Sequence, residues 1–478
     1  MNPEQTFDSS RGRSAVSLWL ITTCVLFAVM VILGFLMRSG QSGVLALDPQ
    51  LFYAIMTLHG LGMAGVLFTG GLAMLWLLVS RYAPPSLRVL NTSYVLIVLG
   101  VVGLVVATLV GRFGPGWYLL YPLPFAASGW PHWSIGLATA SLMILGVGWL
   151  LTQLDILRVI ARRYGPAGML GWTRAGEPET PPTVMIAAVV TVAGSLTTVV
   201  GAAVFFLYLL KWFNPSVEYD ALLLKNMVFL FGHTIVNVTM YMGVAAVYEL
   251  LPEFTGRPWK NNRITTLSWN VTLLFVLTAY FHHIYMDFAQ PFALQIVGQV
   301  TSYLSSVPAT AVTIFGVIGQ VYRGSNRWSF TPLAMTAGIV GWVVGGFAAV
   351  ADSTIAINRV LHNTLWVPGH FHTYFLVGYV LMLLGFAHHL YRSHAEKLAA
   401  ASLGLMLLGG YGLVTSFYLG GANSVPRRYA SYDMIPMSSL ALTGKHLALL
   451  GAISALTFLI GVLTFYVSLM KGRRAAGQ

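Results

Sequence analysis

Six of the twelve histidines lie within long apolar stretches, where ionisable side chains are rare and usually functional. They are His59, His233, His282, His283, His370 and His372. A single histidine in such a place is most often a packing residue with a satisfied hydrogen bond. Six together favour metal binding, because imidazole is a preferred ligand of copper, zinc and iron.

The spacing of these histidines indicates more than one metal centre. His370 and His372 are two residues apart, which places them about 200° apart around an α-helix, on nearly opposite sides. His282 and His283 are neighbours that cannot share a helical face, so the helix must be distorted if both bind one ion. With His233 they would form a three-nitrogen site that suits copper or zinc. The six imidazoles divide into two for a six-coordinate heme, one for a five-coordinate heme and three for copper.

These histidines lie on segments long enough to span a membrane. Only 8% of the 478 residues are charged and 57% are hydrophobic, whereas soluble domains have about 25% charged residues. A helix of about 20 apolar residues crosses a bilayer. Twelve stretches qualify: 15–37, 53–80, 91–112, 129–153, 184–210, 223–251, 265–285, 296–322, 331–352, 365–392, 396–418 and 440–470. The sequence predicts an all-α polytopic membrane protein with twelve transmembrane helices in one domain, residues 1–478.

Positive charges orient the predicted helices. Twelve spans place both termini on one side, and the loops on that side hold 18 of the 26 Lys and Arg residues. The positive-inside rule places both termini in the cytoplasm, and this bias accounts for the net charge of +12 without a nucleic-acid partner. The first span has no small-residue cleavage site, so it is interpreted as a retained helix. Cys24 is the only cysteine, so no disulfide framework is expected.

This orientation predicts a common depth for the histidines. In the second, sixth and tenth spans they lie about five to ten residues from the outer end, or roughly 8 to 15 Å deep. The seventh span runs the other way, and His282 and His283 fall near its outer end. All six are therefore expected in one layer of the outer half of the membrane.

Two arginines stand against the charge bias. Arg427 and Arg428 are adjacent in a predicted outer loop. A surface pair facing lipid headgroups is the simplest interpretation. A fixed anionic partner such as a heme propionate is the alternative, because the Arg guanidinium matches a carboxylate with two donors.

Four motifs resemble subunit I of the heme-copper oxidase superfamily, with most similarity to the B-type oxygen reductases. They are GHTIVNV at 232–238, FHHIYMDF at 281–288, HNTLWVPGHFH at 362–372 and SVPRR at 424–428. The resemblance extends through all twelve spans. It implies the subunit I fold, two hemes and one copper ion, with nonheme iron the less favoured metal. It also implies a bacterial or archaeal cytoplasmic membrane.

The resemblance assigns roles to individual residues. His59 and His372 match the axial ligands of a low-spin heme, and His370 matches the proximal ligand of a high-spin heme. The copper ligands correspond to His233, His282 and His283. His362, Arg427 and Arg428 match residues near the heme propionates. Asp287 matches an acidic residue of the B-type pattern, with Lys225 as its expected ion-pair partner on the outer side.

Position 237 departs from the family pattern. A-type and B-type oxygen reductases carry a Tyr four residues after the first copper-ligand His, covalently joined to it, and a spacing of four puts both on one helical face. Here this residue is Asn237. In cytochrome-c-dependent nitric oxide reductases the position resembles a Glu that helps to bind nonheme iron. A smaller departure is Asn358, where the family commonly has Asp.

The absence of this tyrosine favours nitric oxide reduction over oxygen reduction. Splitting O2 takes four electrons, one of which the family's tyrosine is thought to supply, whereas joining two NO molecules takes only two. Oxygen reduction to water, with or without proton pumping, remains the alternative, because Tyr280 or Tyr241 is a candidate phenol donor. Asn237 is also compatible with a purely structural hydrogen bond between helices.

The eighth span carries a polar stripe made of Tyr303, Ser306, Thr310 and Thr313, at steps of three, four and three. Hydroxyls bonded to their own helix would explain it equally well. The functional interpretation is a proton path like that of B-type enzymes, joined by Tyr248 and Tyr241. Ala309 and Val312 stand where the B-type hydroxyls are expected.

Electrons must enter from another protein, since the sequence has neither a CxxCH motif nor a copper-thiolate cluster. By resemblance this donor is a copper-containing subunit II-like protein or a cytochrome c, and the other partner is membrane lipid. A non-enzyme alternative is a transporter with histidine proton relays. The sequence lacks the paired, interrupted helices of inverted-repeat transporters, which argues against it.

Overall fold

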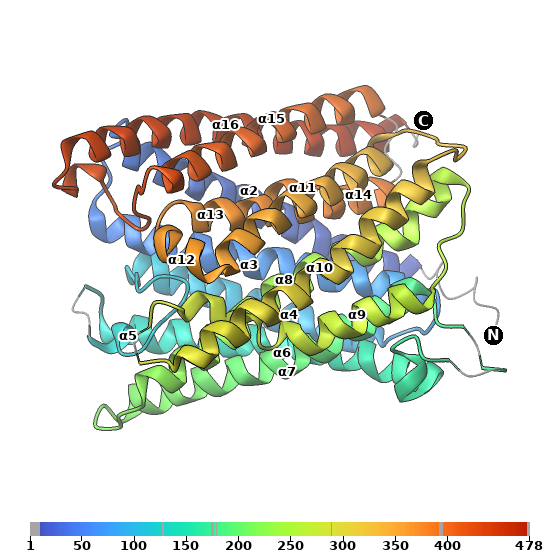
Figure 1. Ribbon diagram of the computed structural model, residues 1–478, viewed down its shortest axis with the longest axis horizontal. Helices are drawn as coiled ribbons and strands as arrows, with labels where there is room; N and C mark the ends of the chain where they lie inside the picture. The colour runs from blue at the N-terminus through green and yellow to red at the C-terminus, as the bar shows by residue number, and fades with distance from the viewer. Residues whose placement is uncertain are drawn as a thin grey trace. The chain divides into compact units, whose positions relative to one another are not determined.

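The computed structural model describes residues 10–126, 129–173, 176–177, 179–287, 289–391 and 395–475. Arg174 and Arg392, two of the positive charges used to orient the chain, lie outside these residues, as does Phe288 of the FHHIYMDF motif. The described part of the chain forms helices joined by loops, without a strand, and its one isolated β-bridge joins Thr364 to Pro426 (Figure 1). The expected all-α fold is confirmed.

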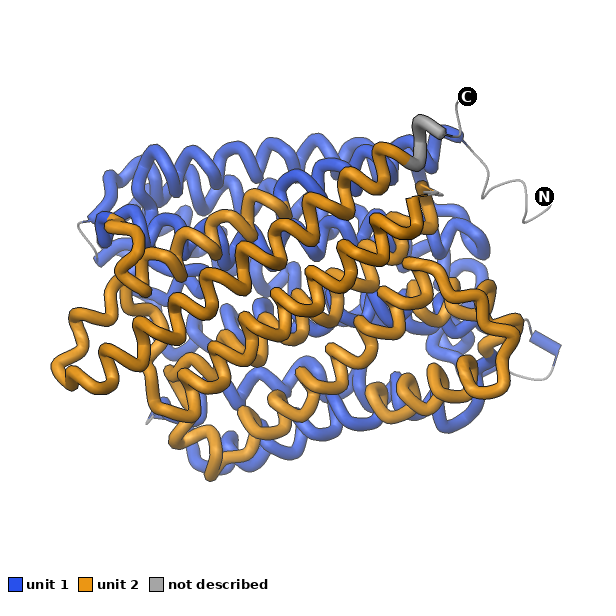
Figure 2. Tube along the Cα trace, turned by 90° about the horizontal axis from the view of Figure 1, so that it is seen from above, with its two compact units in different colours: residues 1–26, 48–245, 260–308 blue, residues 27–47, 246–259, 309–478 orange. Residues whose placement is uncertain are grey.

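The chain divides into two compact units, each built from segments far apart in the sequence (Figure 2). Unit 1 comprises residues 1–26, 48–245 and 260–308, and unit 2 comprises residues 27–47, 246–259 and 309–478. The helices α2, α8 and α10 each contribute to both units. The predicted single domain stays a prediction.

Eleven helices of the described part are long and apolar enough to cross a membrane. They are α2 (Ser10–Ser42), α3 (Pro49–Ser80), α4 (Leu87–Val105) continued by the π-helix η1 (Val106–Val110), α6 (His132–Gly168), α7 (Pro182–Phe213), α8 (Ala221–Thr255), α10 (Phe292–Val321), α11 (Phe330–Ser353), the continuous series α13 (Trp366–His372), η3 (Thr373–Tyr379) and α14 (Val380–Tyr391), α15 (Glu396–Ala422) and α16 (Ser438–Ala475). Three short helices lie outside these spans: α5 (Leu123–Ala126), α12 (Ile355–Leu361) and η4 (Tyr432–Met434).

The seventh predicted span, 265–285, is broken. It consists of α9 (Arg263–Val276) followed by the 3-10 helix η2 (Ala279–Ile284). The break lies just before His282 and His283, where the sequence required a distortion. With 14 residues, α9 alone is too short to count among the eleven long helices, and this break accounts for the difference from the twelve spans predicted.

The fourth predicted span, 129–153, corresponds to α6, which continues past residue 153 to Gly168. Its last turns carry charged residues, among them Asp155 and Arg158, which form an ion pair with an N–O distance of 2.5 Å. Apolar composition therefore located the membrane-crossing part but not the polar continuation of the helix.

Local sequence explains several helix starts. The side chain of Asp48 accepts a hydrogen bond from the Leu51 backbone at the start of α3, where Pro49 occupies the first turn. Ser86 caps α4 and Asn262 caps α9 in the same way. Such caps satisfy backbone N–H groups that have no partner within the helix.

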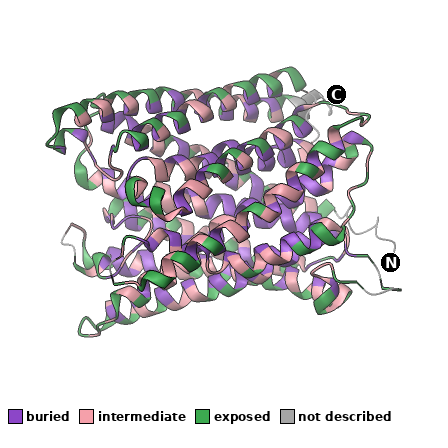
Figure 3. Ribbon diagram, in the orientation of Figure 1, coloured by how far each residue is buried: buried purple, intermediate pink, exposed green. Residues whose placement is uncertain are grey.

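Exposed residues recur along the outer faces of individual helices (Figure 3), and many of them are large and apolar. On α16 the residues Leu449, Ile453, Leu456, Ile460 and Leu463 are all more than 40% exposed and recur every three or four positions. A continuous apolar stripe of this kind suits contact with lipid tails, because water would disfavour it.

Candidate metal centres

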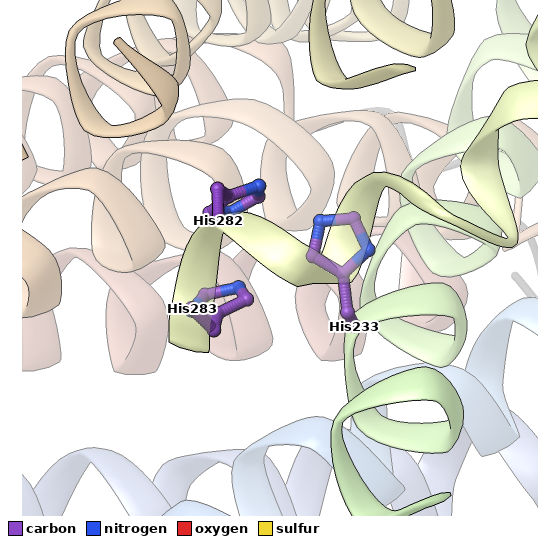
Figure 4. A group of neighbouring side chains, drawn as sticks. All are labelled: His233, His282 and His283. Atoms are coloured by element: carbon purple, nitrogen blue, oxygen red, sulfur yellow. The ribbon is translucent and has the colours of Figure 1, made fainter. Parts of the chain in front are cut away.

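Three imidazoles converge within unit 1 (Figure 4). His233 projects from α8, and His282 and His283 come from η2. One ring nitrogen of each lies within 4.8 Å of the others, and the ring centroids of His282 and His283 are 4.1 Å apart. His282 is buried and the other two are half-buried. The three imidazoles are therefore close enough to hold one metal ion, and three imidazole nitrogens suit copper or zinc.

Neighbouring side chains fix the planes of the η2 imidazoles. The ring of Phe229, one turn before His233 on α8, stacks on His283 at 5.4 Å and 14°. His282 Nδ1 lies 2.9 Å from the hydroxyl of Ser302 on α10. Sequence analysis missed Ser302, because it lies just off the polar stripe that drew attention to that helix.

Asn237 lies one helical turn after His233, as the spacing predicts. Its side-chain amide donates to the His233 carbonyl at 2.8 Å, and the same nitrogen lies 3.4 Å from His233 Nε2. The amide thus bonds to its own helix and contacts the imidazole at its Nε2 edge. Both contacts are with His233 of the same helix, so neither is the hydrogen bond between helices that the sequence left open as an alternative.

The two alternative tyrosines lie in different surroundings. The Tyr280 hydroxyl donates to the Asn226 side chain at 3.1 Å, two turns of α8 away from His233. Tyr241 is buried, and its ring packs edge-on against Trp269 of α9 at 5.2 Å. Both tyrosines thus make contacts away from the three imidazoles.

The expected ion pair of Asp287 is present in unit 1. Lys225 Nζ of α8 lies 2.6 Å from the Asp287 carboxylate, which comes shortly after η2. Both side chains are partly buried, with relative exposures of 30% and 15%. The pair ties the segment that carries His282 and His283 to the helix that carries His233.

His370 and His372 lie in unit 2 and face different neighbours. His370 Nδ1 donates to the carbonyl of Gly345 on α11 at 3.1 Å. His372 Nδ1 donates to the Pro368 carbonyl at 2.7 Å, and its ring lies 5.0 Å from Phe417 of α15. The two rings thus have different neighbours, as the spacing predicts, and in both residues the Nδ1 bond leaves Nε2 available. The assignment of the two histidines to two metal centres stays a prediction.

His59 lies on α3 in unit 1 and is half-buried. Its pairing with His372 of unit 2, and the common depth of all six histidines, stay predictions.

The proposed propionate-binding residues gather at one end of the unit 2 helices. Arg427 donates to the side chain of Asn363 at 2.9 Å, and His362 ends α12. Arg428 has a positive φ of 71°, a conformation that non-glycine residues rarely adopt. The roles of Arg427, Arg428 and His362 stay predictions.

Two charged residues of unit 2 were missed by the sequence analysis. Arg38 of α2 is 4% exposed, and its Nε and Nη2 have no hydrogen-bond partner among the described residues. Asp352 of α11 is 5% exposed, and its backbone carbonyl accepts from the Asn358 side chain at 2.6 Å. A buried carboxyl thus lies next to the position where the family pattern would have placed Asp. The available signals were a carboxylate at the last position of a predicted span for Asp352 and an arginine directly after the first predicted span for Arg38.

Two residues of the predicted proton path contact each other, and the path itself stays a prediction. Tyr248 of α8 and Thr313 of α10 are hydrogen-bonded at 2.9 Å within unit 2. The Thr310 hydroxyl is buried without a partner in the described part of the chain. Tyr303 and Ser306 belong to unit 1, so the predicted stripe is divided between the units.

The fold and the three converging imidazoles define a polytopic membrane protein with a candidate metal site. The family model for cytochrome c and quinol oxidase polypeptide I matches residues 14–456. The chain belongs to this family.

Individual relatives agree with this assignment. The chain is 26% identical over 347 residues to a heme-copper oxidase subunit I+III of Aeropyrum pernix, a match that covers 69% of this chain and 40% of the relative. It is 25% identical to cytochrome c oxidase subunit 1 of Thermus thermophilus, covering 46% and 44% of the two chains. The chain thus matches less than half the length of either relative.

A third relative matches over a longer region. An alternative cytochrome c oxidase subunit 1 of Bradyrhizobium diazoefficiens is 24% identical, with 86% of this chain and 73% of the relative covered. The fold also matches a solved structure of a heme-copper terminal oxidase dimer with a TM-score of 0.81 at 19% identity, covering 97% of this chain and 84% of the other.

Proposed function

We propose that this chain is the catalytic subunit of a membrane-bound heme-copper reductase that converts two NO, two electrons and two protons to N2O and water. The observation that carries the proposal is Asn237. Its amide occupies the position one turn after His233 and touches that imidazole. An amide supplies neither an electron nor an acidic proton, and the two-electron reaction needs neither from this position.

The residues present fit the metals that this function requires. The three imidazoles of His233, His282 and His283 have the donor type and proximity for one copper ion. We assign His370 to a high-spin heme, and His59 with His372 to a low-spin heme. When bound, these groups supply the electrons and the site at which NO is held.

The protein's own side chains would orient these groups and manage charge. Arg427, Arg428 and His362 would bind the heme propionates, as Arg donors suit carboxylates. The Lys225–Asp287 pair would hold the copper-ligand segment in register with α8. Asn237 would keep the His233 ring in one orientation by contact at Nε2.

Protons would reach the site along α8 and α10. The Tyr248–Thr313 hydrogen bond is one element of such a route. Tyr303, Ser306, Thr310 and Tyr241 are the further candidates. Electrons would enter from a subunit II-like protein or a cytochrome c on the outer side, in the cytoplasmic membrane of a bacterium or archaeon. Membership of an oxidase family favours this redox role over the transporter alternative.

The test is a comparison of substrates in the purified complex. Reduced enzyme is offered NO and O2 separately, and consumption of each gas is followed. We expect NO turnover much faster than O2 turnover. Asn237→Ala should retain NO turnover within a factor of about 10 to 100, the range for residues that support metal ligands. Complete reduction of O2 to water with negligible NO turnover would overturn the proposal.

Reduction of O2 to water is the second candidate, with four electrons and four protons per O2. The names of the relatives favour it, because they are cytochrome c oxidase subunits. Oxygen reduction would need a tyrosine at another position to supply the phenol, because residue 237 is Asn. Tyr280→Phe and Tyr241→Phe test this, since one of them should abolish O2 turnover if its phenol takes part.

A further inference from the structure

The hydroxyl of Ser302 lies at the meeting point of η2 and α10 in unit 1. Its oxygen is 2.9 Å from His282 Nδ1, 2.5 Å from the Gly298 carbonyl and 3.1 Å from the Ala279 carbonyl. Ser302 is 5% exposed and His282 is 7% exposed. This polar group is therefore shielded, and its hydrogen bonds are made within the protein.

The number of protons available decides the direction of these bonds. A serine hydroxyl has one hydrogen to donate, whereas a carbonyl oxygen can only accept. With two carbonyls in range, the Ser302 hydrogen goes to a carbonyl. The Ser302 oxygen then accepts, and the remaining donor is the Nδ1–H of His282.

We propose that Ser302 is a positioning residue that fixes the tautomer of His282, so that Nε2 is the nitrogen that binds the metal. A neutral imidazole carries a proton on one nitrogen only, and the other nitrogen offers its lone pair. Acceptance of the Nδ1 proton by Ser302 thus prepares Nε2. This inference rests on the proposed copper site and adds to it a residue outside the ligand set.

The same arrangement strengthens the ligand. An imidazole that donates its second N–H to an oxygen becomes a better electron donor, and loss of such partners typically weakens metal binding about 10- to 100-fold. His370 and His372 use backbone carbonyls for this purpose. A hydroxyl on α10 does it for His282, so substitution can remove the partner without breaking the backbone.

The experiment compares three variants in the purified complex. Ser302→Ala removes the acceptor, and Ser302→Thr keeps a hydroxyl at the same position. Ser305→Ala is the matched control, because Ser305 is a buried serine one turn away whose hydroxyl donates to the Ser302 carbonyl at 3.0 Å. Copper per heme is measured during dialysis against a chelator, together with the infrared stretch of carbon monoxide on the cuprous ion.

We expect Ser302→Ala to lose copper about 10- to 100-fold more readily than the wild type. The carbon monoxide stretch should move to higher frequency, because a weaker imidazole donor leaves less electron density for back-donation. Ser302→Thr should retain copper far better than Ser302→Ala, and Ser305→Ala should match the wild type in both measurements.

Two results would overturn the inference. One is wild-type copper retention and an unchanged carbon monoxide stretch in Ser302→Ala. The other is equal copper loss in Ser302→Ala and Ser302→Thr, because the hydroxyl would then not matter. Neither result bears on whether NO is the substrate. Conversely, a wild type that binds copper but reduces only O2 contradicts the proposed substrate and leaves the role of Ser302 standing.

Discussion

Two segments of the chain each carry a closely spaced pair of histidines, and they use them differently. In η2 the neighbours His282 and His283 have ring centroids 4.1 Å apart and converge with His233. In α13 the residues His370 and His372, two apart, turn to α11 and α15 respectively. The helix is broken before the first pair and regular through the second. Local helix geometry therefore decides whether two closely spaced imidazoles converge or face different helices.

The segments also differ in where the backbone is distorted. After His372 the chain forms the π-helix η3, and α11 packs directly against it. A Cβ atom on Gly341 of α11 would lie 1.9 Å from the Val377 carbonyl oxygen, so only glycine allows this approach. A π-helix inserted in an α-helix is often found at functional sites. The distortion therefore follows the second pair directly, whereas His282 and His283 lie within the distorted segment η2 itself.

The largest expected effect comes from the converging pair. His282→Ala and His283→Ala should give the same result as His233→Ala, namely loss of copper with the low-spin heme spectrum retained. The reason is that all three are proposed to donate to one ion. Metal analysis beside the visible spectrum checks this. Full copper retention in all three variants would show that the site is not a copper site.

Substitutions of His370 and His372 should affect different heme signals in the same visible spectrum. His372→Ala, like His59→Ala, should remove the six-coordinate low-spin heme signal, and His370→Ala should affect the high-spin heme. The two histidines face different neighbours, so one substitution should spare the other centre. If His370→Ala removes the low-spin signal, the two sides of α13 have been assigned in reverse.

A smaller effect is expected from Gly345, whose carbonyl accepts from His370. A Cβ atom here would lie 2.5 Å from the Tyr374 ring, so Gly345→Ala should cost about 2 kcal/mol of stability. It should also perturb the high-spin heme spectrum and spare the copper. Gly346→Ala is the control, since a Cβ atom there meets nothing within 4 Å. Equal thermal stability and equal spectra of the two variants would argue against this contact.

The smallest effect should come from the ion pair behind η2. Asp287→Asn weakens a pair that is partly exposed, so a loss of about 1 kcal/mol is expected. Copper should be held less firmly while both hemes stay unchanged. Asp433→Asn, which breaks the more exposed pair with Lys445, serves as the comparison and should leave copper retention unaltered. A heme defect in Asp287→Asn would place this carboxylate at a heme instead.

The sequence by itself determined the membrane class, most of the helices and the candidate metal ligands. Apolar runs reveal spanning helices because lipid leaves few alternatives for the backbone, and buried ionisable groups stand out against them. The distortion at His282 and His283 was predictable for a related reason, since two adjacent imidazoles cannot share one face of a regular helix. Asn237 was identified from its spacing to His233.

Only the tertiary structure decided which groups support these ligands. Ser302 is 20 residues from His282, and Phe229 is 54 from His283. The close approach of Gly341 to η3, and the burial of Arg38 and Asp352, also depend on helices distant in sequence. Hydrophobic periodicity shows which face of a helix is apolar, but not which neighbour covers that face or at what height. Helix packing sets such partners, among them Ser302 for His282, Phe229 for His283 and Gly345 for His370.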